Sequence, residues 1–172
     1  MLHILDITAP DINNGLGCRV TLWVSGCKHK CKGCHNKWTW KYNQGRCFET
    51  FRREIFEELA NWLDKPYISG LTLSGGDPLC QNDDALQEII TIINWFKQRY
   101  PQKNIWLYTG YTIDEIYESD NKLIKEITNL CDVIVDGPYI ESQRDISGTP
   151  FRGSKNQNLI YNMNANKKIN KI

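Results

Sequence analysis

The chain of 172 residues is long enough for one domain with a hydrophobic core. Its composition is that of a globular protein, and a formal net charge of +1 gives no bulk electrostatic argument for a nucleic-acid or membrane partner. The apolar runs are too short to cross a bilayer or to act as a signal sequence. Seven cysteines without a secretion signal indicate a reducing compartment, so we expect a cytoplasmic protein whose thiols serve metals or catalysis.

The predicted elements alternate between strand and helix along the chain. Five segments have the composition of strands, the first of them a short edge strand: 2–7, 18–24, 68–73, 104–108 and 131–135. A helix with one apolar face is expected to begin near Phe51 and to end before Pro66, and a second is capped by Asn82 or Asp83. A third begins at a capping box formed by Thr112 and Glu115, breaks near 119–121 and resumes to Leu130.

This alternation predicts an α/β fold with a parallel sheet and crossover helices. Because there are too few units for eight strands, we expect a partial, open (βα) barrel of about four to six mostly parallel strands. Residues 1–162 are expected to form a single domain, followed by a polar, mobile tail over 163–172. Ligands in such sheets collect at the carboxyl ends of the strands, where four loops are expected to meet: 26–36, 74–78, 109–111 and 136–138.

Three cysteines, Cys27, Cys31 and Cys34, follow the second predicted strand at the spacing C-x3-C-x2-C. Thiolates this close in sequence converge on one metal centre with little loop-closure cost. A [4Fe–4S] cluster takes four thiolates, so three would leave one iron open, as catalytic metal sites require. A zinc site that recruits His29 or His35 is the alternative, although the usual second C-x2-C or H-x3-H is missing. The spacing alone favours the cluster over zinc.

The segment Ser74-Gly75-Gly76-Asp77 follows a predicted buried strand. Its two glycines would let a ligand approach the backbone closely, and Asp77 could accept hydrogen bonds from an ammonium group. Taken alone, the segment is better explained as an ordinary strand-to-helix turn.

Together these motifs resemble the radical S-adenosylmethionine superfamily, which shares the cysteine spacing and a glycine-glycine-acid motif. More narrowly, the chain resembles the activating proteins of anaerobic ribonucleoside-triphosphate reductase over about residues 11–160. The segments that carry this narrower resemblance are 15–21, 24–27, 33–37, 73–79, 108–111, 135–137 and 151–157. Two positions depart from the superfamily pattern: Gly33 stands where many members carry an aromatic residue, and Asp77 stands where many carry Glu.

The resemblance implies that Cys27, Cys31 and Cys34 hold a [4Fe–4S] cluster and that S-adenosylmethionine chelates its fourth iron. The residues implied to bind S-adenosylmethionine are Gly33, Cys34, His35, Ser74, Gly75, Gly76, Asp77 and Thr109. The implied activity is that of a glycyl-radical-enzyme activating enzyme, an oxidoreductase that uses a 5′-deoxyadenosyl radical to install a glycyl radical on the reductase. A low-potential electron donor such as flavodoxin is the second implied partner.

Two other functions remain open at this point. One is a small radical enzyme that acts on a free metabolite, similar to a deazapurine synthase, and the other is a zinc-stabilised binding module. The remaining cysteines are scattered and are expected to be small buried hydrophobes: Cys18, Cys47, Cys80 and Cys131. A role near the site is less favoured for Cys80, although it closely follows the glycine motif. Trp38 and Trp40 are predicted to form a partner-facing surface.

Overall fold

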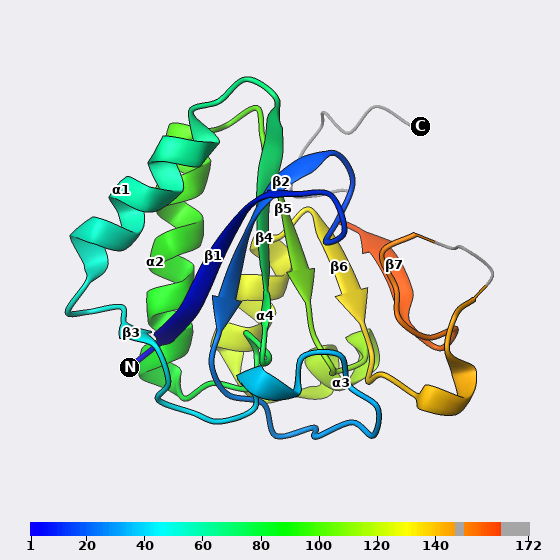
Figure 1. Cartoon of the computed structure of the whole chain (residues 1–172). Helices are drawn as coiled ribbons and strands as arrows, with labels where there is room; N and C mark the ends of the chain where they lie inside the picture. The colour runs from blue at the N-terminus through cyan, green and yellow to red at the C-terminus, as the bar shows by residue number, and fades with distance from the viewer. Residues whose placement is uncertain (147–149, 163–172) are drawn as a thin grey trace.

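A computed structural model describes residues 1–146 and 150–162, so the predicted tail over 163–172 lies outside the described residues. A seven-stranded sheet forms the centre, in the order β3-β1-β2-β4-β5-β6-β7 (Figure 1). Its strands are β1 (His3–Asp11), β2 (Cys18–Val24), β3 (Arg46–Cys47), β4 (Ile68–Gly75), β5 (Asn104–Tyr108), β6 (Val133–Asp136) and β7 (Asn158–Tyr161). The central strands β2, β4, β5 and β6 run parallel, whereas β1, β3 and β7 pair antiparallel with their neighbours.

The sheet confirms the α/β class and the open architecture but corrects three details. It has seven strands rather than four to six, and only its central four are parallel. The prediction of a first edge strand is wrong, because β1 extends to Asp11 and β3 pairs with its outer side. Both unpredicted strands, β3 and β7, are too short to carry a readable alternation. The partial barrel stays a prediction, since within the described residues the sheet ends in open edges at β3 and β7.

The helices lie where their apolar periodicity predicts them. They are α1 (Arg52–Leu63), α2 (Asp83–Arg99), α3 (Ile113–Glu118) and α4 (Lys122–Leu130), with 3-10 turns η1 (Lys37–Thr39) and η2 (Glu141–Gln143). Asn82 caps α2 by accepting a hydrogen bond from the Ala85 amide at 3.0 Å, and the capping box of Thr112 and Glu115 is complete. Within the described ranges, no helix combines the length and apolarity needed to cross a bilayer.

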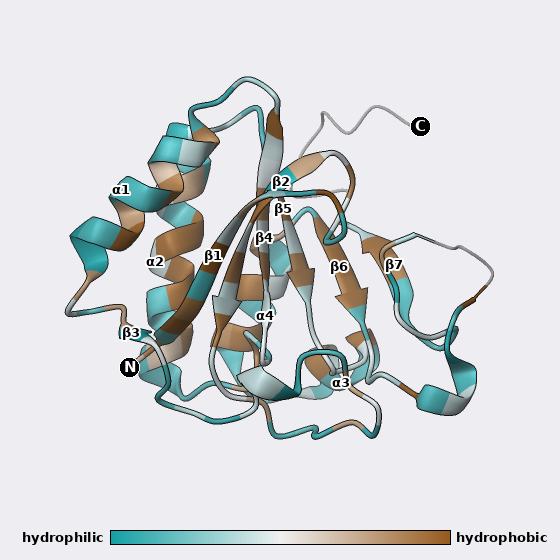
Figure 2. Cartoon of the chain, in the orientation of Figure 1, coloured by the Kyte–Doolittle hydropathy of each residue, from teal (hydrophilic) through white to brown (hydrophobic). Residues whose placement is uncertain are grey.

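The two faces of the sheet are covered differently. One face carries buried aliphatic side chains, such as Leu22 and Leu73, and α2 and α4 lie behind it in Figure 1. Figure 2 shows apolar stretches along the strands and on α2, whereas the outer turns of α1 are hydrophilic. On the opposite face, Thr21 and Thr72 are buried in β2 and β4, and a small apolar cluster forms around Trp106. Because strand side chains alternate, this second face is free of the main helical core and holds polar groups.

Arg19 is fully buried among the polar groups of this second face. Its Nε donates to Thr72 Oγ1 at 2.7 Å, and its two Nη atoms donate to Leu16 O, Leu71 O and both oxygens of Asn104. Its guanidinium carbon lies 5.4 Å from the centre of the Trp106 ring. Burial lowers the pKa of Arg19 to about 10, which leaves the side chain charged at neutral pH. The guanidinium therefore joins three strands and the loop before β2 through hydrogen bonds.

Arg19→Met is expected to lower the free energy of unfolding by about 3–5 kcal/mol, because it leaves buried acceptors without their donor. Urea unfolding followed by circular dichroism measures the loss. Arg53→Met is the matched control, since Arg53 is exposed and pairs with Glu57 one helical turn away. A loss for Arg19→Met no larger than that of the control would show that the buried network does not stabilise the fold.

Candidate functional site

The four predicted loops meet at the carboxyl edge of β2, β4, β5 and β6. Two backbone hydrogen bonds, each 2.8 Å long, hold the loop after β4 in place. The Gly76 amide donates to Val24 O at the end of β2, and the Asp77 amide donates to Gly26 O in the cysteine loop. On the other side, the amide of Gly137 donates to Tyr111 O at 2.8 Å. The expectation that separate loops gather at one edge is therefore confirmed.

The glycine motif is packed directly against the cysteine loop. Gly75 has a positive φ of 118°, which side chains rarely adopt. A Cβ atom at Gly76 would lie only 2.2 Å from the carbonyl oxygen of Gly26, the residue before Cys27. The two loops can approach so closely because Gly76 lacks a side chain.

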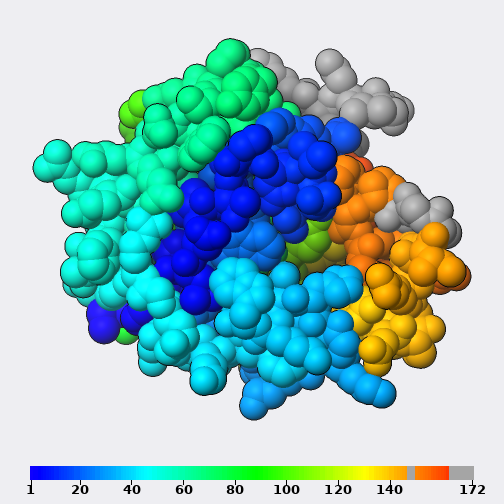
Figure 3. All heavy atoms as spheres, viewed as in Figure 1, coloured from blue at the N-terminus to red at the C-terminus, as the bar shows by residue number. Residues whose placement is uncertain are grey.

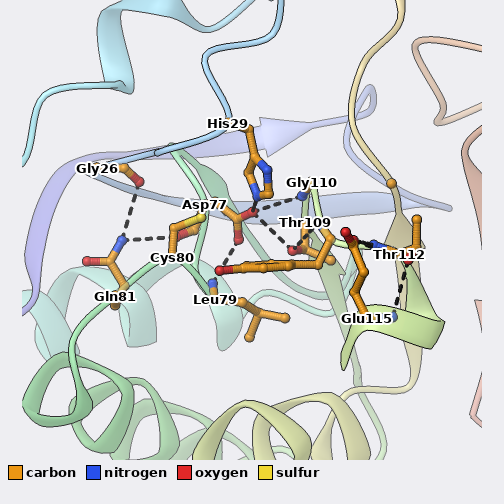
Figure 4. Close-up of polar contacts among 12 residues, drawn as sticks. Gly26, His29, Asp77, Leu79, Cys80, Gln81, Thr109, Gly110, Thr112 and Glu115 are labelled. Atoms are coloured by element: carbon orange, nitrogen blue, oxygen red, sulfur yellow. Dashed lines mark hydrogen bonds and ion pairs between the residues drawn. The ribbon is translucent and has the colours of Figure 1, made fainter. Parts of the chain in front are cut away.

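Asp77 is the centre of the polar network at this edge (Figure 4). Its carboxylate is 1% exposed, and Oδ2 accepts hydrogen bonds from His29 Nε2 at 2.9 Å, Thr109 Oγ1 at 3.0 Å and the Gly110 amide at 2.8 Å. The other oxygen, Oδ1, accepts from the Leu79 amide at 2.8 Å. The hydrogen bond that His29 donates to Asp77 raises the pKa of His29, which favours the charged imidazolium beside the carboxylate. A buried negative charge is thereby held next to the cysteine loop.

Cys80 also belongs to this site. Cys27 and Cys80 are both buried, each 7% exposed. The interaction between their neighbouring thiols lowers the pKa of Cys27 to about 6 and raises the pKa of Cys80. Ligand atoms of Cys80, His29 and Asp77 lie within 4.8 Å of one another. Cys80 is thus more than a packing residue, and the only signal in the sequence is its place three residues after Asp77.

The other two predicted ligands, Cys31 and Cys34, are half-buried further along the loop. The Cys34 amide donates to Cys31 O at 3.1 Å, and the Asn36 amide donates to Cys34 Sγ at 3.4 Å. Burial raises the pKa of Cys31, and charge on Cys27 and Cys34 raises it further. All seven cysteines are free thiols.

The residues predicted to bind S-adenosylmethionine fall into two groups. Gly75, Gly76, Asp77 and Thr109 are together, with the Thr109 hydroxyl bound to Asp77, and Ser74 is buried at the end of β4. Residues 33–35 lie instead against the segment after β6. There a Cβ at Gly33 would lie 2.7 Å from Glu141 Oε1, and the exposed ring of His35 lies 5.2 Å from that of Tyr139.

The residues present fit an iron–sulfur cluster. Three free thiols share one loop, glycines bend that loop at Gly26 and Gly33 with positive φ, and hydrogen-bond donors to sulfur are already aimed at Cys27 and Cys34. This combination is typical of proteins that carry such a cluster.

Comparison with protein families agrees with this class of site. A family described as a 4Fe-4S single cluster domain matches residues 13–160, a range that includes all four loops at the carboxyl edge. The chain therefore belongs to the proteins with a single [4Fe–4S] cluster domain, which favours the cluster over a zinc site.

Comparison with individual proteins identifies the family more specifically. Three proteins named anaerobic ribonucleoside-triphosphate reductase-activating protein illustrate the similarity. The one from phage T4 is 43% identical over 152 residues, which cover 88% of this chain and 89% of the relative. Those from Vibrio cholerae and Escherichia coli K12 are 41% and 38% identical over 149 residues, or 86% of this chain and 90% of each relative. The chain belongs to the family of anaerobic ribonucleoside-triphosphate reductase-activating proteins.

Proposed function

We propose that the chain uses a [4Fe–4S] cluster and S-adenosylmethionine to install a glycyl radical on an anaerobic ribonucleoside-triphosphate reductase. The observation that carries this proposal is the contact between a loop of three free thiols and the buried Gly76–Asp77 motif at the carboxyl edge of parallel strands. The family named above supports it, and a reducing cytoplasm is the compartment that suits these thiols.

In this proposal, Cys27, Cys31 and Cys34 would hold three irons and leave the fourth open for S-adenosylmethionine. When bound, these groups supply a 5′-deoxyadenosyl radical that removes a hydrogen atom from a glycine Cα of the reductase. The chain's own contribution is positioning. The backbone of Gly75 and Gly76 is open to a ligand that no side chain obstructs.

Asp77 would accept the ammonium group of S-adenosylmethionine, but its carboxylate already has four donors. The Gly110 and Leu79 amides are fixed by the backbone, and Thr109 directly follows β5. His29 is the donor best able to leave, because it comes from the cysteine loop and its side chain is 16% exposed. We therefore infer that the ammonium group displaces His29 from Asp77.

Asp77→Asn is expected to weaken S-adenosylmethionine binding by roughly ten- to a hundredfold while the cluster is retained. The reason is the loss of a charge-assisted hydrogen bond of about 1.5–3 kcal/mol. Titration of the electron paramagnetic resonance signal of the reduced cluster with S-adenosylmethionine measures the change. Asp64→Asn is the control, because Asp64 pairs with Arg99 at the other end of the sheet. An unchanged midpoint in Asp77→Asn would contradict the assigned role.

The activity itself is tested by mixing reduced protein, S-adenosylmethionine and an anaerobic ribonucleoside-triphosphate reductase without oxygen. A doublet split by the glycine α-hydrogen should appear in the electron paramagnetic resonance spectrum and should collapse when the reductase glycine is deuterated at Cα. Cleavage of S-adenosylmethionine without this signal, but with turnover of a free metabolite, would instead favour an enzyme similar to a deazapurine synthase.

A further inference from the structure

The positive charge of the chain is concentrated on the cysteine loop and the segment that follows it. Residues 28–41 contain five lysines and no acidic residue, whereas the rest of the chain has 16 basic and 20 acidic residues, a formal charge of −4. All five lysine side chains are exposed: Lys28, Lys30, Lys32, Lys37 and Lys41. Among these five lysines, only Lys32 forms an ion pair in the described structure, with Glu141 at 3.7 Å. Figure 3 shows this segment in blue to light blue along the lower part of the molecule.

Three of these lysines surround a hollow beside a predicted cluster ligand. The hollow has a volume of about 640 Å³ and is lined by Cys27, Lys28, Lys30, Trp40, Lys41 and Tyr42. We name it the lysine hollow. Its aromatic wall is accessible, since Tyr42 is 45% exposed and Trp40 is half-buried. An aromatic wall surrounded by exposed charge is the composition expected of a protein–protein contact.

The lysine hollow is preformed. The amides of Gly26 and Cys27 donate to Thr39 O at 2.8 Å and Trp40 O at 3.1 Å, which ties the aromatic segment to the cysteine loop. The Tyr42 hydroxyl donates to Cys80 O at 2.9 Å, and the Tyr42 ring occupies the space that a side chain at Gly26 would fill. The binding of a partner would therefore not require the free energy of ordering this segment.

The position of the hollow favours a partner other than the reductase. Its lining includes Cys27 but no residue of the loops 74–78, 109–111 or 136–138. Together with the cysteine loop, those loops form the edge where S-adenosylmethionine and the glycine of the reductase would meet in the proposed function. A protein seated in the hollow would approach the sulfur of Cys27 from the side of the cysteine loop, and it would lie next to the other loops only at Lys28, whose Nζ is 4.8 Å from the centre of the Tyr111 ring.

We propose that the lysine hollow is the docking site of an acidic, low-potential one-electron carrier protein that reduces the cluster. This rests on the proposed function, in which cleavage of S-adenosylmethionine consumes one electron from outside the chain. The carrier loses one electron and the cluster gains it, and no bond forms or breaks in this step. Opposite charge on the carrier would speed its encounter with the hollow and make reduction sensitive to salt, since exposed charges are screened beyond about 8 Å at physiological ionic strength.

The test compares charge reversal in the hollow with the same reversal elsewhere. The variant is Lys28→Glu/Lys30→Glu/Lys41→Glu, and the matched control is Arg53→Glu/Lys122→Glu/Lys125→Glu on α1 and α4. Each cluster-loaded protein is reduced either by dithionite, which needs no docking surface, or by a purified acidic flavodoxin in its reduced form. The rate of cluster reduction, the affinity for flavodoxin by titration and the dependence of both on salt are measured.

With flavodoxin, the hollow variant should be reduced at least tenfold more slowly and bind at least tenfold more weakly than wild type, while the control variant should match wild type. Raising the salt concentration should slow cluster reduction by flavodoxin in wild type but not in the hollow variant.

Equal rates and affinities for hollow variant and wild type would overturn the proposal. So would a hollow variant that cleaves S-adenosylmethionine with dithionite yet no longer activates the reductase, because the hollow would then dock the reductase. Absence of dithionite-driven cleavage in wild type would refute the proposed function instead, and the flavodoxin titration would still test docking.

Discussion

Replacing Cys27, Cys31 or Cys34 singly by Ala is expected to abolish the [4Fe–4S] cluster and all cleavage of S-adenosylmethionine. Each substitution removes one of the three proposed protein ligands, and no other cysteine lies in the same loop. Iron and sulfide analysis after anaerobic reconstitution, together with the visible absorbance of the cluster, measures the loss. The effect should be complete rather than graded, because a cube with two protein ligands would expose two irons to solvent.

Cys47→Ala and Cys18→Ala are the controls, since both residues are half-buried free thiols outside the cysteine loop. They should keep the iron content of wild type. Full iron and sulfide in Cys31→Ala would contradict the ligand assignment. Cys80 would then be the first alternative ligand to examine, because the interaction between the Cys80 and Cys27 thiols shifts the pKa of Cys27.

Much of the fold follows from local patterns in the sequence. The strand over 18–24 and the strand over 104–108 were predicted at their observed bounds, and the cap at Asn82 and the capping box at Thr112 are present as expected. These features depend on alternation and on side chains within four residues of the backbone they satisfy, so a single sequence contains all the information needed.

The features that sequence reasoning missed depend on contacts between distant segments. Arg19 sits in a strand where an exposed side chain would be the usual expectation, yet its partners Thr72 and Asn104 bury it completely. The two-residue strand β3 exists only because β1 offers it an edge. Neither feature leaves a pattern in the local sequence.

In the candidate site, too, local patterns predicted some features, whereas contacts between distant segments were missed. The spacing of the three cysteines and the glycine motif predicted both loops, and the direction of the parallel strands predicted their meeting. His29 was considered only as a zinc ligand, whereas it binds Asp77 from 48 residues away in sequence. That pairing requires the cysteine loop to fold back over β4, which no local pattern encodes.

Gly76→Ala is expected to disrupt the contact between the glycine motif and the cysteine loop. The added Cβ would lie 2.2 Å from Gly26 O and 2.6 Å from Gly26 C, and these are backbone atoms that no rotamer change can move. Relief requires the cysteine loop to shift away from β4, which would break the hydrogen bond from the Asp77 amide to Gly26 O. Overpacking of this kind costs about 1–3 kcal/mol. The shift would also separate Cys27 from Asp77, so we expect S-adenosylmethionine binding to weaken at least tenfold.

Gly137→Ala distinguishes this local effect from a general loss of stability. Gly137 lies at the same edge of the sheet, but the nearest atom to an added Cβ is Asn156 Nδ2 at 3.7 Å. Its φ of 87° makes Ala unfavourable there by about 1–2 kcal/mol, so the control should lose stability without a steric clash. Thermal unfolding and S-adenosylmethionine titration of the cluster signal are measured for both variants. We expect similar losses of stability, with the affinity for S-adenosylmethionine reduced only in Gly76→Ala. Wild-type affinity in Gly76→Ala would mean that the close contact between the two loops is not needed to bind the cofactor.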